Sequence, residues 1–159
     1  MSSKIITNME AIKFLNIKKG IGKKIVFTNG VYDLLHVGHV RYLKEASSYG
    51  DCIIVAVNSD DSVRKLKGSK RPIINQYNRA EVLSSLEFIT YVTVFNDLTP
   101  IKLIEDIRPD FLIKGCDWRS AKIVGKEFVE DYGGKIIRIK LVEGVSTTKI
   151  IEKILKKRK

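Results

Sequence analysis

The 159-residue chain has only two cysteines and no long apolar run. Cys52 and Cys116 are too few for a disulfide framework or a four-cysteine zinc site, so they are expected to be reduced thiols. The longest strongly apolar run, Cys52–Val57, is far shorter than a membrane span, and the amino terminus lacks the apolar region of a signal peptide. The sequence therefore predicts a cytoplasmic protein without a membrane anchor.

The central part of the chain contributes little to the net charge of +11. Residues 1–24 carry six Lys and one Glu, and residues 149–159 carry five Lys, one Arg and one Glu. Positive charge gathered at the two ends is typical of solvated lysine-rich termini. A surface that recognises a nucleic-acid sequence would instead concentrate it on one face of the fold, so we expect no specific nucleic-acid partner. A nucleic-acid-binding protein is the alternative, and it would keep its affinity for duplex at about 200 mM salt.

No repeat or Pro/Gly-rich linker interrupts the chain, and 44% hydrophobic residues are enough for one core. Apolar, β-branched runs alternate with helical periodicity, which indicates parallel strands covered by helices. We expect a single Rossmann-like α/β domain over residues 1–159, with a five-stranded parallel sheet and helices on both faces. The strands are predicted at Lys24–Asn29, Cys52–Asn58, Tyr91–Phe95, Phe111–Lys114 and Lys135–Lys140. The helices are predicted near Gly38–Tyr49, Tyr77–Leu86, Pro100–Ile107, Val124–Tyr132 and Thr147–Lys157.

The segment after the first predicted strand contains the only two histidines of the chain, His36 and His39. Ligands bind at the carboxyl ends of the strands in such a fold, so this segment is expected to line the site. Near a helix start, side chains three residues apart project to one side, and Gly38 leaves the backbone open to a phosphate. Free N–H groups, the positive helix end and neutral imidazole donors favour an anion there. A zinc site is disfavoured because no third ligand lies nearby in the sequence.

The string His36-Val37-Gly38-His39 resembles the signature of the nucleotidyltransferase superfamily, which includes cytidylyltransferases and class I aminoacyl-tRNA synthetases. Further matches follow in order: Asn29–His36, Gly50-Asp51, Val55–Asp60, Lys67-Gly68, Arg71-Pro72, Lys114-Gly115 with Asp117, and Gly144–Thr148. Together they resemble the branch of the family that transfers AMP from ATP to D-glycero-D-manno-heptose 1-phosphate and releases pyrophosphate. The likeness extends over about residues 24–156.

The resemblance implies a reaction in which the protein positions the reactants and stabilises charge, while no side chain acts as nucleophile. It implies that His36 and His39 hold the α- and β-phosphates and that Lys44, farther along the same helix, reaches a phosphate. The nucleotide would also be bound at Thr28, Asn29, Gly30, Gly38, Lys114, Gly115, Ser146, Thr147 and Thr148.

The resemblance also implies a set of residues for the acceptor. An ionised Asp33 only accepts hydrogen bonds, which suits a substrate hydroxyl or a cation. The cations Lys67, Arg71 and Arg79 would face the acceptor's phosphate or the pyrophosphate. The polar side chains Asn58, Asp60 and Asp117 are candidates for the sugar, although residues of these types also form ordinary turns.

ATP and a sugar phosphate are the partners that the resemblance implies, and relatives of this kind are often homodimers. Mg²⁺ is expected to arrive on the nucleotide, because no carboxylate cluster in the sequence indicates a protein-built site. Two alternatives stay open. Glycerol-3-phosphate cytidylyltransferases share the His-x-Gly-His and Gly-x-Ser-Thr-Thr segments, and a nucleotide-binding sensor would bind ATP without turnover.

Overall fold

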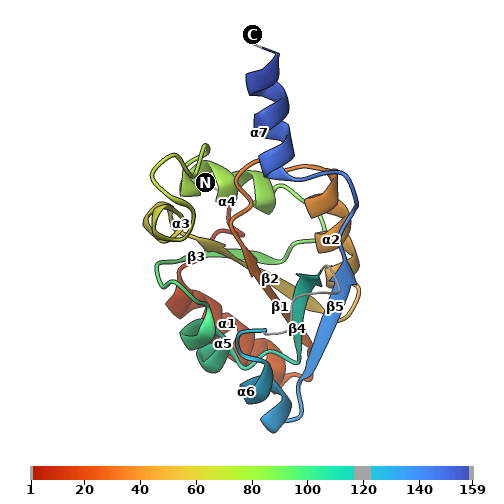
Figure 1. The fold of residues 1–159 in the computed structure, drawn as a ribbon. Coiled ribbons are helices and arrows are strands. Elements are labelled where there is room, and N and C mark those ends of the chain that lie inside the picture. The colour runs from red at the N-terminus through yellow and green to blue at the C-terminus, as the bar shows by residue number, and fades with distance from the viewer. Residues whose placement is uncertain (1, 117–122, 158–159) are drawn as a thin grey trace.

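Five parallel strands form the centre of the fold, seen in a computed structural model that describes residues 2–116 and 123–157 (Figure 1). Their order across the sheet is β3-β2-β1-β4-β5. All five predicted strands are confirmed, with ends that differ by two residues at most. They are β1 (Ile25–Gly30), β2 (Cys52–Asn58), β3 (Tyr91–Phe95), β4 (Phe111–Cys116) and β5 (Lys135–Lys140).

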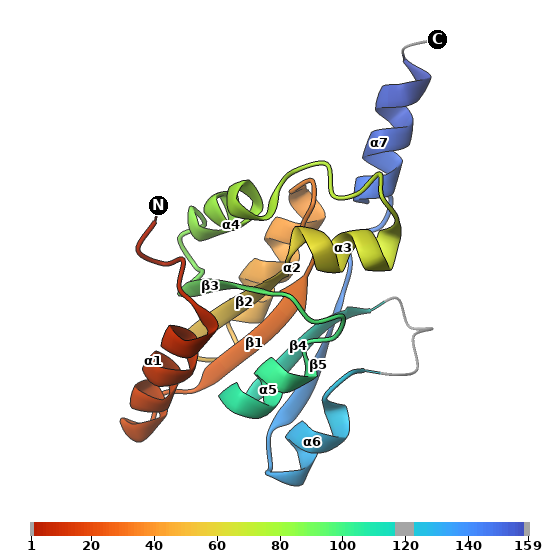
Figure 2. The ribbon, with the colours of Figure 1, turned by 90° about the vertical axis from the view of Figure 1, so that its left-hand side faces the viewer.

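Helices cover both faces of the sheet, as the alternating pattern predicts (Figure 2). One face packs against α2 and α4, and the other packs against α1, α5 and α6. Among the described residues, no helix is both long and apolar enough to cross a membrane. The helices are α1 (Asn8–Gly20), α2 (Val37–Ser47), α3 (Asp60–Lys67), α4 (Gln76–Ser84), α5 (Ile101–Ile107), α6 (Lys126–Asp131) and α7 (Thr147–Lys156).

The strands divide their side chains between two apolar cores. Every residue of β2 is buried, because a parallel strand in the middle of a sheet is covered on both faces. Successive residues point to opposite faces, so Phe27 and Ile54 pack with α1 and α5, whereas Val26 and Val55 pack with α2 and α4. Because all paired strands run parallel, the loops that follow them lie at one end of the sheet.

Two helices, α1 and α3, were not expected from the sequence. In α1, Thr7 and Glu10 form a capping box: the Glu10 carboxylate accepts from the Thr7 N–H at 2.8 Å, and the Thr7 hydroxyl accepts from the Glu10 N–H at 3.2 Å. Only Ala11 and Leu15 of this lysine-rich helix are buried, so its apolar periodicity is weak. The Thr-x-x-Glu spacing is the signal that could have located it.

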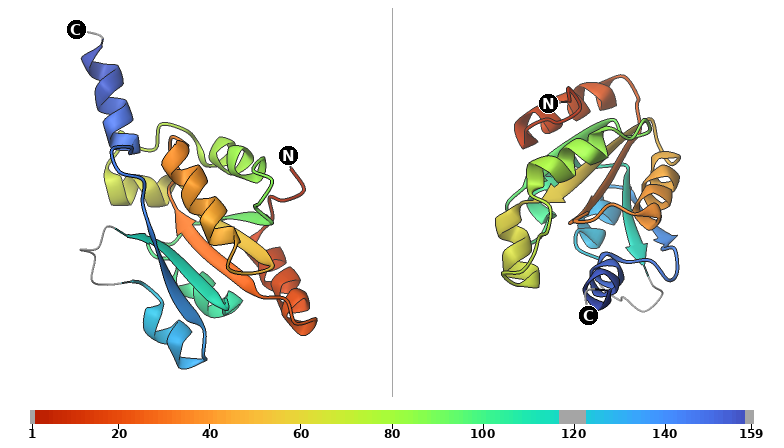
Figure 3. Two further views of the ribbon diagram at one scale, coloured as in Figure 1. Left: turned by 90° about the vertical axis from the view of Figure 1, so that its right-hand side faces the viewer. Right: turned by 90° about the horizontal axis from the view of Figure 1, so that it is seen from above.

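The last helix, α7, projects from the end of the molecule instead of covering the sheet (Figures 1 and 3). None of its residues is buried. The predicted helix is therefore confirmed, but it packs differently from the other helices.

Packing of α1 against the sheet can be tested with two substitutions in the same helix. Leu15 is fully buried, so Leu15→Ala should lower the free energy of unfolding by about 2–5 kcal/mol. Ile17 is 56% exposed, so Ile17→Ala should change it by no more than about 0.5 kcal/mol. Urea unfolding of both variants gives the comparison. Equally small losses would indicate a frayed amino-terminal segment and contradict the packed helix.

Candidate active site

The site lies at the end of the sheet where the chain changes its winding direction. From β1 the chain winds outward through β2 and β3, and then crosses to β4 on the other side of β1. Strand β1 pairs with β2 along its whole length, but with β4 only through Val26↔Phe111 and Phe27↔Leu112. The carboxyl ends of β1 and β4 are therefore not paired with each other, and this switch point is where doubly wound sheets bind ligands.

A cavity of about 220 Å³ at this end brings together three segments that are far apart in the sequence. They are the start of α2, the end of α3 with the loop after it, and the start of α7 with the loop before it. The lining residues are His36, Gly38, His39, Lys67, Arg71, Leu141, Val142, Val145, Ser146, Thr147 and Thr148. The structure thus brings together eight of the residues that the sequence analysis assigned to nucleotide and acceptor.

The two imidazoles stack on each other at the first turn of α2. The ring centroids of His36 and His39 are 3.8 Å apart with an interplanar angle of 20°. Tyr32 meets His39 edge-on, with 5.3 Å between the ring centroids. A Cβ at Gly38 would lie 3.0 Å from the His36 ring, so the glycine makes room for the imidazole as well as leaving the backbone open. The open backbone at Gly38 was predicted from the sequence, whereas the room for the His36 ring was not.

Burial keeps both imidazoles neutral at physiological pH. Desolvation lowers the pKa of His36, and desolvation followed by the charge of His36 lowers the pKa of His39 to about 4. The Nδ1 atoms of both rings are buried and have no hydrogen-bond partner among the described residues. Because both rings line the cavity, Nε2 is the ring nitrogen that a ligand there can reach, and a neutral ring can donate a hydrogen bond from it.

Two helix starts face the same cavity. His36 precedes α2 without a side-chain cap, so no side chain in the described part of the chain satisfies the first N–H groups of α2. Ser146 caps α7 by accepting from the Lys149 N–H at 3.2 Å, and Thr147 donates weakly to the Leu34 carbonyl at 3.5 Å. Together with the cations Lys67 and Arg71, the helix starts make the cavity suitable for several phosphate oxygens.

Asp33 is an anchor for the loop that carries Arg71. Its carboxylate accepts from Arg71 Nε at 2.5 Å and from the Ile73 and Ile74 N–H groups at 2.8 and 2.9 Å. Its side chain is 1% exposed. Burial alone would raise the pKa of Asp33, but these three donors together hold it below its usual range. Asp33 was predicted to bind a substrate hydroxyl or a cation. In the structure its carboxylate instead accepts hydrogen bonds from three protein groups.

Arg79 is the clearest difference between prediction and structure. Its side chain is 0% exposed, and its guanidinium donates to the Ile74 carbonyl at 2.9 Å, the Val31 carbonyl at 2.5 Å and Asp60 Oδ1 at 2.7 Å. Arg79 therefore connects the segments around the site by hydrogen bonds, and it does not line the cavity where a phosphate would bind. The sequence shows that this residue is positively charged. It does not show that the fold surrounds the guanidinium with two carbonyls and a carboxylate that accept its hydrogen bonds.

Asn58 and Asp60 also lie outside the cavity. Asn58 is buried and donates to the Ser62 hydroxyl at 3.0 Å, while the carboxylate of Asp60 pairs with Arg79. Both residues stand where β2 leads into α3, so they stabilise the start of the helix that ends at Lys67. The structure places them in a supporting network, whereas a sugar contact was predicted.

Thr28 and Lys44 are also away from the cavity. The Thr28 hydroxyl shares a hydrogen bond of 2.6 Å with the Tyr42 hydroxyl in the interior of the protein. Lys44 is exposed in the last turn of α2. Five residues along a helix correspond to about 7.5 Å and about 140° of rotation, so Lys44 faces away from the side that presents His39.

The remaining predicted residues surround the site. The Lys114 amino group contacts the Asn29 side chain between the ends of β4 and β1, and burial lowers the pKa of Lys114 to about 8. A Cβ at Gly30 would lie 2.9 Å from the Tyr32 ring, and a Cβ at Gly115 would lie 2.6 Å from Leu141 Cδ2. Both glycines therefore leave room for side chains at the site. Asp117 lies outside the described residues.

Sequence reasoning missed two contributions to the site. Tyr32 packs on His39, and an apolar wall of Leu141, Val142 and Val145 lines the cavity beside the imidazoles. Leu141 is 44% exposed, so this wall offers apolar contact at the edge of the cavity and leaves the cavity open to solvent. Tyr32 lies inside the matched string, but an aromatic ring there predicts core packing as readily as contact with a histidine.

The anchoring role of Asp33 predicts a large loss of stability in Asp33→Asn. Breaking this buried pair with Arg71 should cost about 3 kcal/mol of unfolding free energy. Asp61→Asn is the matched control, because Asp61 is 80% exposed and its pair with Arg64 should contribute less than about 1 kcal/mol. Denaturant titration measures both, and similar losses would contradict the anchor.

The low pKa of His39 predicts a specific loss of stability in acid. The unfolded chain binds the proton of this histidine near pH 6.5, whereas the folded chain binds it only near pH 4. The contribution of neutral His39 to the free energy of unfolding is therefore fully present at pH 7, and it is lost as the pH falls from about 6.5 to about 4. Thermal unfolding of His39→Asn should show a shallower fall than the wild type between pH 7 and pH 4.5. Parallel curves would show that His39 titrates normally.

Comparisons with known proteins agree with this geometry. Residues 27–153 match the cytidylyltransferase-like family. The chain is 50% identical over 152 residues to the bifunctional protein HldE of Geobacter metallireducens, and 54% identical over 139 residues to that of Geobacter sulfurreducens. These alignments cover 95% and 87% of this chain but only 31% and 28% of the relatives, so the chain spans about a third of their length.

Two solved structures share the fold. A lipopolysaccharide core biosynthesis protein from Thermoplasma volcanium superposes with a TM-score of 0.63 and 26% identity, over 76% of this chain and 98% of that one. Pantoate-beta-alanine ligase from Francisella tularensis superposes with a TM-score of 0.57 over 98% of this chain and 78% of that one, and its 16% identity supports the fold alone. With the histidine pair at the switch point, the family match establishes that this chain belongs to the cytidylyltransferase-like family of nucleotidyltransferases.

Proposed function

We propose that this nucleotidyltransferase transfers AMP from ATP to D-glycero-D-manno-heptose 1-phosphate, giving ADP-heptose and pyrophosphate. The observation that carries the proposal is the single cavity in which two neutral imidazoles, two helix starts and two cations converge. The heptose acceptor is supported by the wider sequence resemblance and by the similarity to the HldE proteins and to a lipopolysaccharide core biosynthesis protein.

The proposed reaction is an in-line displacement at phosphorus. A phosphate oxygen of the acceptor attacks the α-phosphorus of ATP, a new P–O bond forms, and the bond to the β-phosphate oxygen breaks as pyrophosphate leaves with the electron pair. His36 and His39 donate hydrogen bonds from Nε2 to oxygens of the α- and β-phosphates. Because the rings are fixed by stacking before the substrate arrives, they need little reorganisation as negative charge builds up.

The other walls of the cavity would hold the phosphates that do not react. The start of α7, with Ser146, Thr147 and Thr148, offers hydroxyls and N–H groups to the outer oxygens of the triphosphate. Arg71, oriented by Asp33, and Lys67 at the end of α3 supply positive charge for the acceptor's phosphate or the leaving pyrophosphate.

Mg²⁺ enters the proposal as part of the substrate, carried on ATP. No group of three or more His, Cys, Asp and Glu side chains in the described ranges is arranged to hold a metal, and the carboxylate of Asp33 is already paired. In the proposal the ion arrives with the nucleotide, because a triphosphate binds it in water and its charge helps to neutralise pyrophosphate.

Pyrophosphate release tests the proposed function across a panel of nucleotides and acceptors. We expect turnover with ATP and D-glycero-D-manno-heptose 1-phosphate. Activity only with CTP and glycerol 3-phosphate would replace this reaction with that of the cytidylyltransferase alternative. Binding of ATP without pyrophosphate release for any acceptor would indicate a nucleotide sensor.

The role of the imidazoles is tested in the same assay. His39→Ala should lower kcat about 10²- to 10³-fold while the Kd for ATP rises much less, because the donor acts mainly on charge that develops in the transition state. Arg41→Ala, an exposed position of the same helix, is the control and should keep normal turnover. Nearly normal turnover in His39→Ala would exclude the proposed mechanism.

A further inference from the structure

Strands β1 and β4 separate before either of them ends. Their backbone pairing stops at Phe27↔Leu112, although β1 continues to Gly30 and β4 continues to Cys116. Beyond this pair, no ladder bond joins the two strands in the described part of the chain. The backbone groups that face the gap need other hydrogen-bond partners, because an unpaired polar group away from water destabilises a fold.

Tyr42 bridges the first level of this gap. Its hydroxyl shares a hydrogen bond of 2.6 Å with the Thr28 hydroxyl and donates to the Ile113 carbonyl at 3.2 Å. A hydroxyl carries one proton, so Tyr42 accepts from Thr28 while it donates to the carbonyl. Thr28 and Ile113 directly follow the last paired residues of β1 and β4. The tyrosine side chain therefore replaces the ladder where the two backbones separate.

The next residues along the two strands, Asn29 and Lys114, bridge the second level of the gap. The Lys114 amino group contacts the Asn29 side-chain oxygen. An ammonium has three donors, and Asn29 is its only hydrogen-bond partner among the described residues, so two donors are open to a ligand oxygen. A Cβ on the following residue, Gly115, would lie 2.6 Å from Leu141, which lines the cavity of the histidine pair. The end of β4 therefore borders that cavity.

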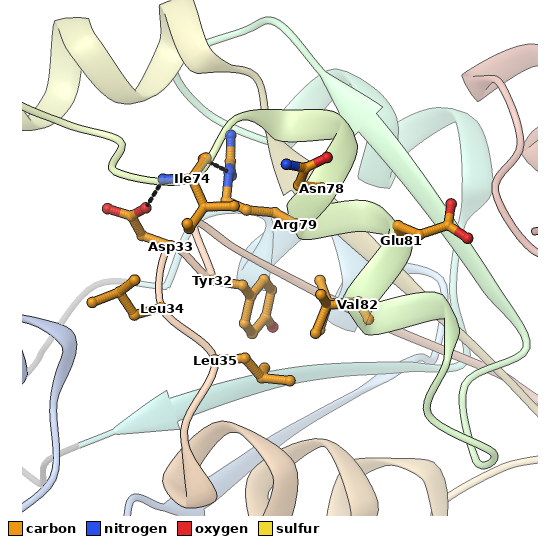
Figure 4. Close-up of a pocket in the computed structure, with 10 residues that line it drawn as sticks. Tyr32, Asp33, Leu34, Leu35, Ile74, Asn78, Arg79, Glu81 and Val82 are labelled. Atoms are coloured by element: carbon orange, nitrogen blue, oxygen red, sulfur yellow. Dashed lines mark hydrogen bonds between the residues drawn. The ribbon is translucent and has the colours of Figure 1, made fainter. Parts of the chain in front are cut away.

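Tyr42 also belongs to the helix that carries the histidine pair. It stands three residues after His39, so the two side chains leave α2 on the same side. The Thr28 side chain interacts with the Tyr32 hydroxyl as well, and the Tyr32 ring packs edge-on against His39. The same ring lines a cavity of about 470 Å³ beside α4 (Figure 4). The three hydroxyl groups thus connect His39 to the carboxyl end of β4.

We propose that Tyr42 is a positioning residue for nucleotidyl transfer, whose hydroxyl holds Lys114 where the ammonium meets an anionic oxygen of the bound nucleotide. The Ile113 carbonyl that accepts from Tyr42 belongs to the peptide group that leads into Lys114, so fixing this carbonyl fixes the backbone of the lysine. A lysine ammonium acts as a point charge and suits a phosphate oxygen. The role rests on the proposed function, because it places the nucleotide in the cavity that Leu141 lines.

A purely structural tyrosine would differ from a positioning one at the Ile113 carbonyl. Without the hydroxyl, this carbonyl loses its donor, and either water enters or the end of β4 shifts to satisfy it. Both changes hydrate Lys114 and loosen its contact with Asn29. A tyrosine that only fills the core would affect stability and leave the lysine as it is.

Titration of the Lys114 amino group by NMR tests the positioning without any substrate. In Tyr42→Phe, which removes only the hydroxyl, the pKa of Lys114 should rise above its value of about 8, because water near the ammonium stabilises its charged form. Thr28→Val removes the other partner of the hydroxyl but keeps the bond to Ile113, so this variant should leave the pKa unchanged. An unchanged pKa in Tyr42→Phe, or equal rises in both variants, would overturn the proposal.

Calorimetric titration with ATP and the pyrophosphate assay test the consequence for the nucleotide. Tyr42→Phe should raise the Kd for ATP about tenfold, which corresponds to one well-made hydrogen bond. The value of kcat should fall less than this, because the stacked imidazoles are unaltered. An unchanged Kd together with a loss of thermal stability would show that Tyr42 serves only the core.

Tyr49→Phe is the matched control, since it makes the same chemical change in a residue that is 37% exposed and has no hydrogen bond from its hydroxyl among the described residues. It should behave as the wild type does, and circular dichroism checks that every variant is folded. A wild type that binds ATP but releases no pyrophosphate with any acceptor would remove the proposed reaction, while the Lys114 titration and the Kd would still decide the role of Tyr42. A wild type that does not bind ATP would overturn both.

Discussion

The stacking of His36 on His39 is the contact on which the rest of the site depends. Two imidazoles 3.8 Å apart would repel each other if both were charged, and burial keeps them neutral. Neutral rings can still donate hydrogen bonds, so the pair can meet a phosphate without first losing or gaining a proton. Gly38 leaves space for one ring and Tyr32 supports the other, which fixes the pair before a ligand binds.

Much of the charge around this pair serves as support. Asp33 holds the loop of Arg71, while Arg79 ties that loop to the start of α3 through Asp60. A buried charged group destabilises the fold unless its hydrogen bonds are made. Because these bonds are made only when the loops lie as they do here, the network holds the loops in one arrangement. Of the three cations predicted to face the acceptor's phosphate or the pyrophosphate, Lys67 and Arg71 line the cavity, whereas Arg79 is bonded within the supporting network.

The fold could be predicted from the sequence because strands such as β2 carry an unbroken apolar run, here Cys52–Val57. The site could be located because the histidine motif follows the first strand and a hydroxyl-rich segment precedes the last helix. Individual roles could not be predicted for Arg79 or Lys44, since charge does not reveal burial and spacing does not reveal which helix face meets a ligand. Helix α1 escaped prediction because two buried side chains give little periodicity.

A crystal structure with a non-hydrolysable ATP analogue tests the central claim most directly. The account predicts the α-phosphate within hydrogen-bond distance of a ring nitrogen of His36 or His39, with the outer phosphates at the start of α7. A triphosphate bound elsewhere, with the two imidazoles still stacked and out of its reach, would contradict it.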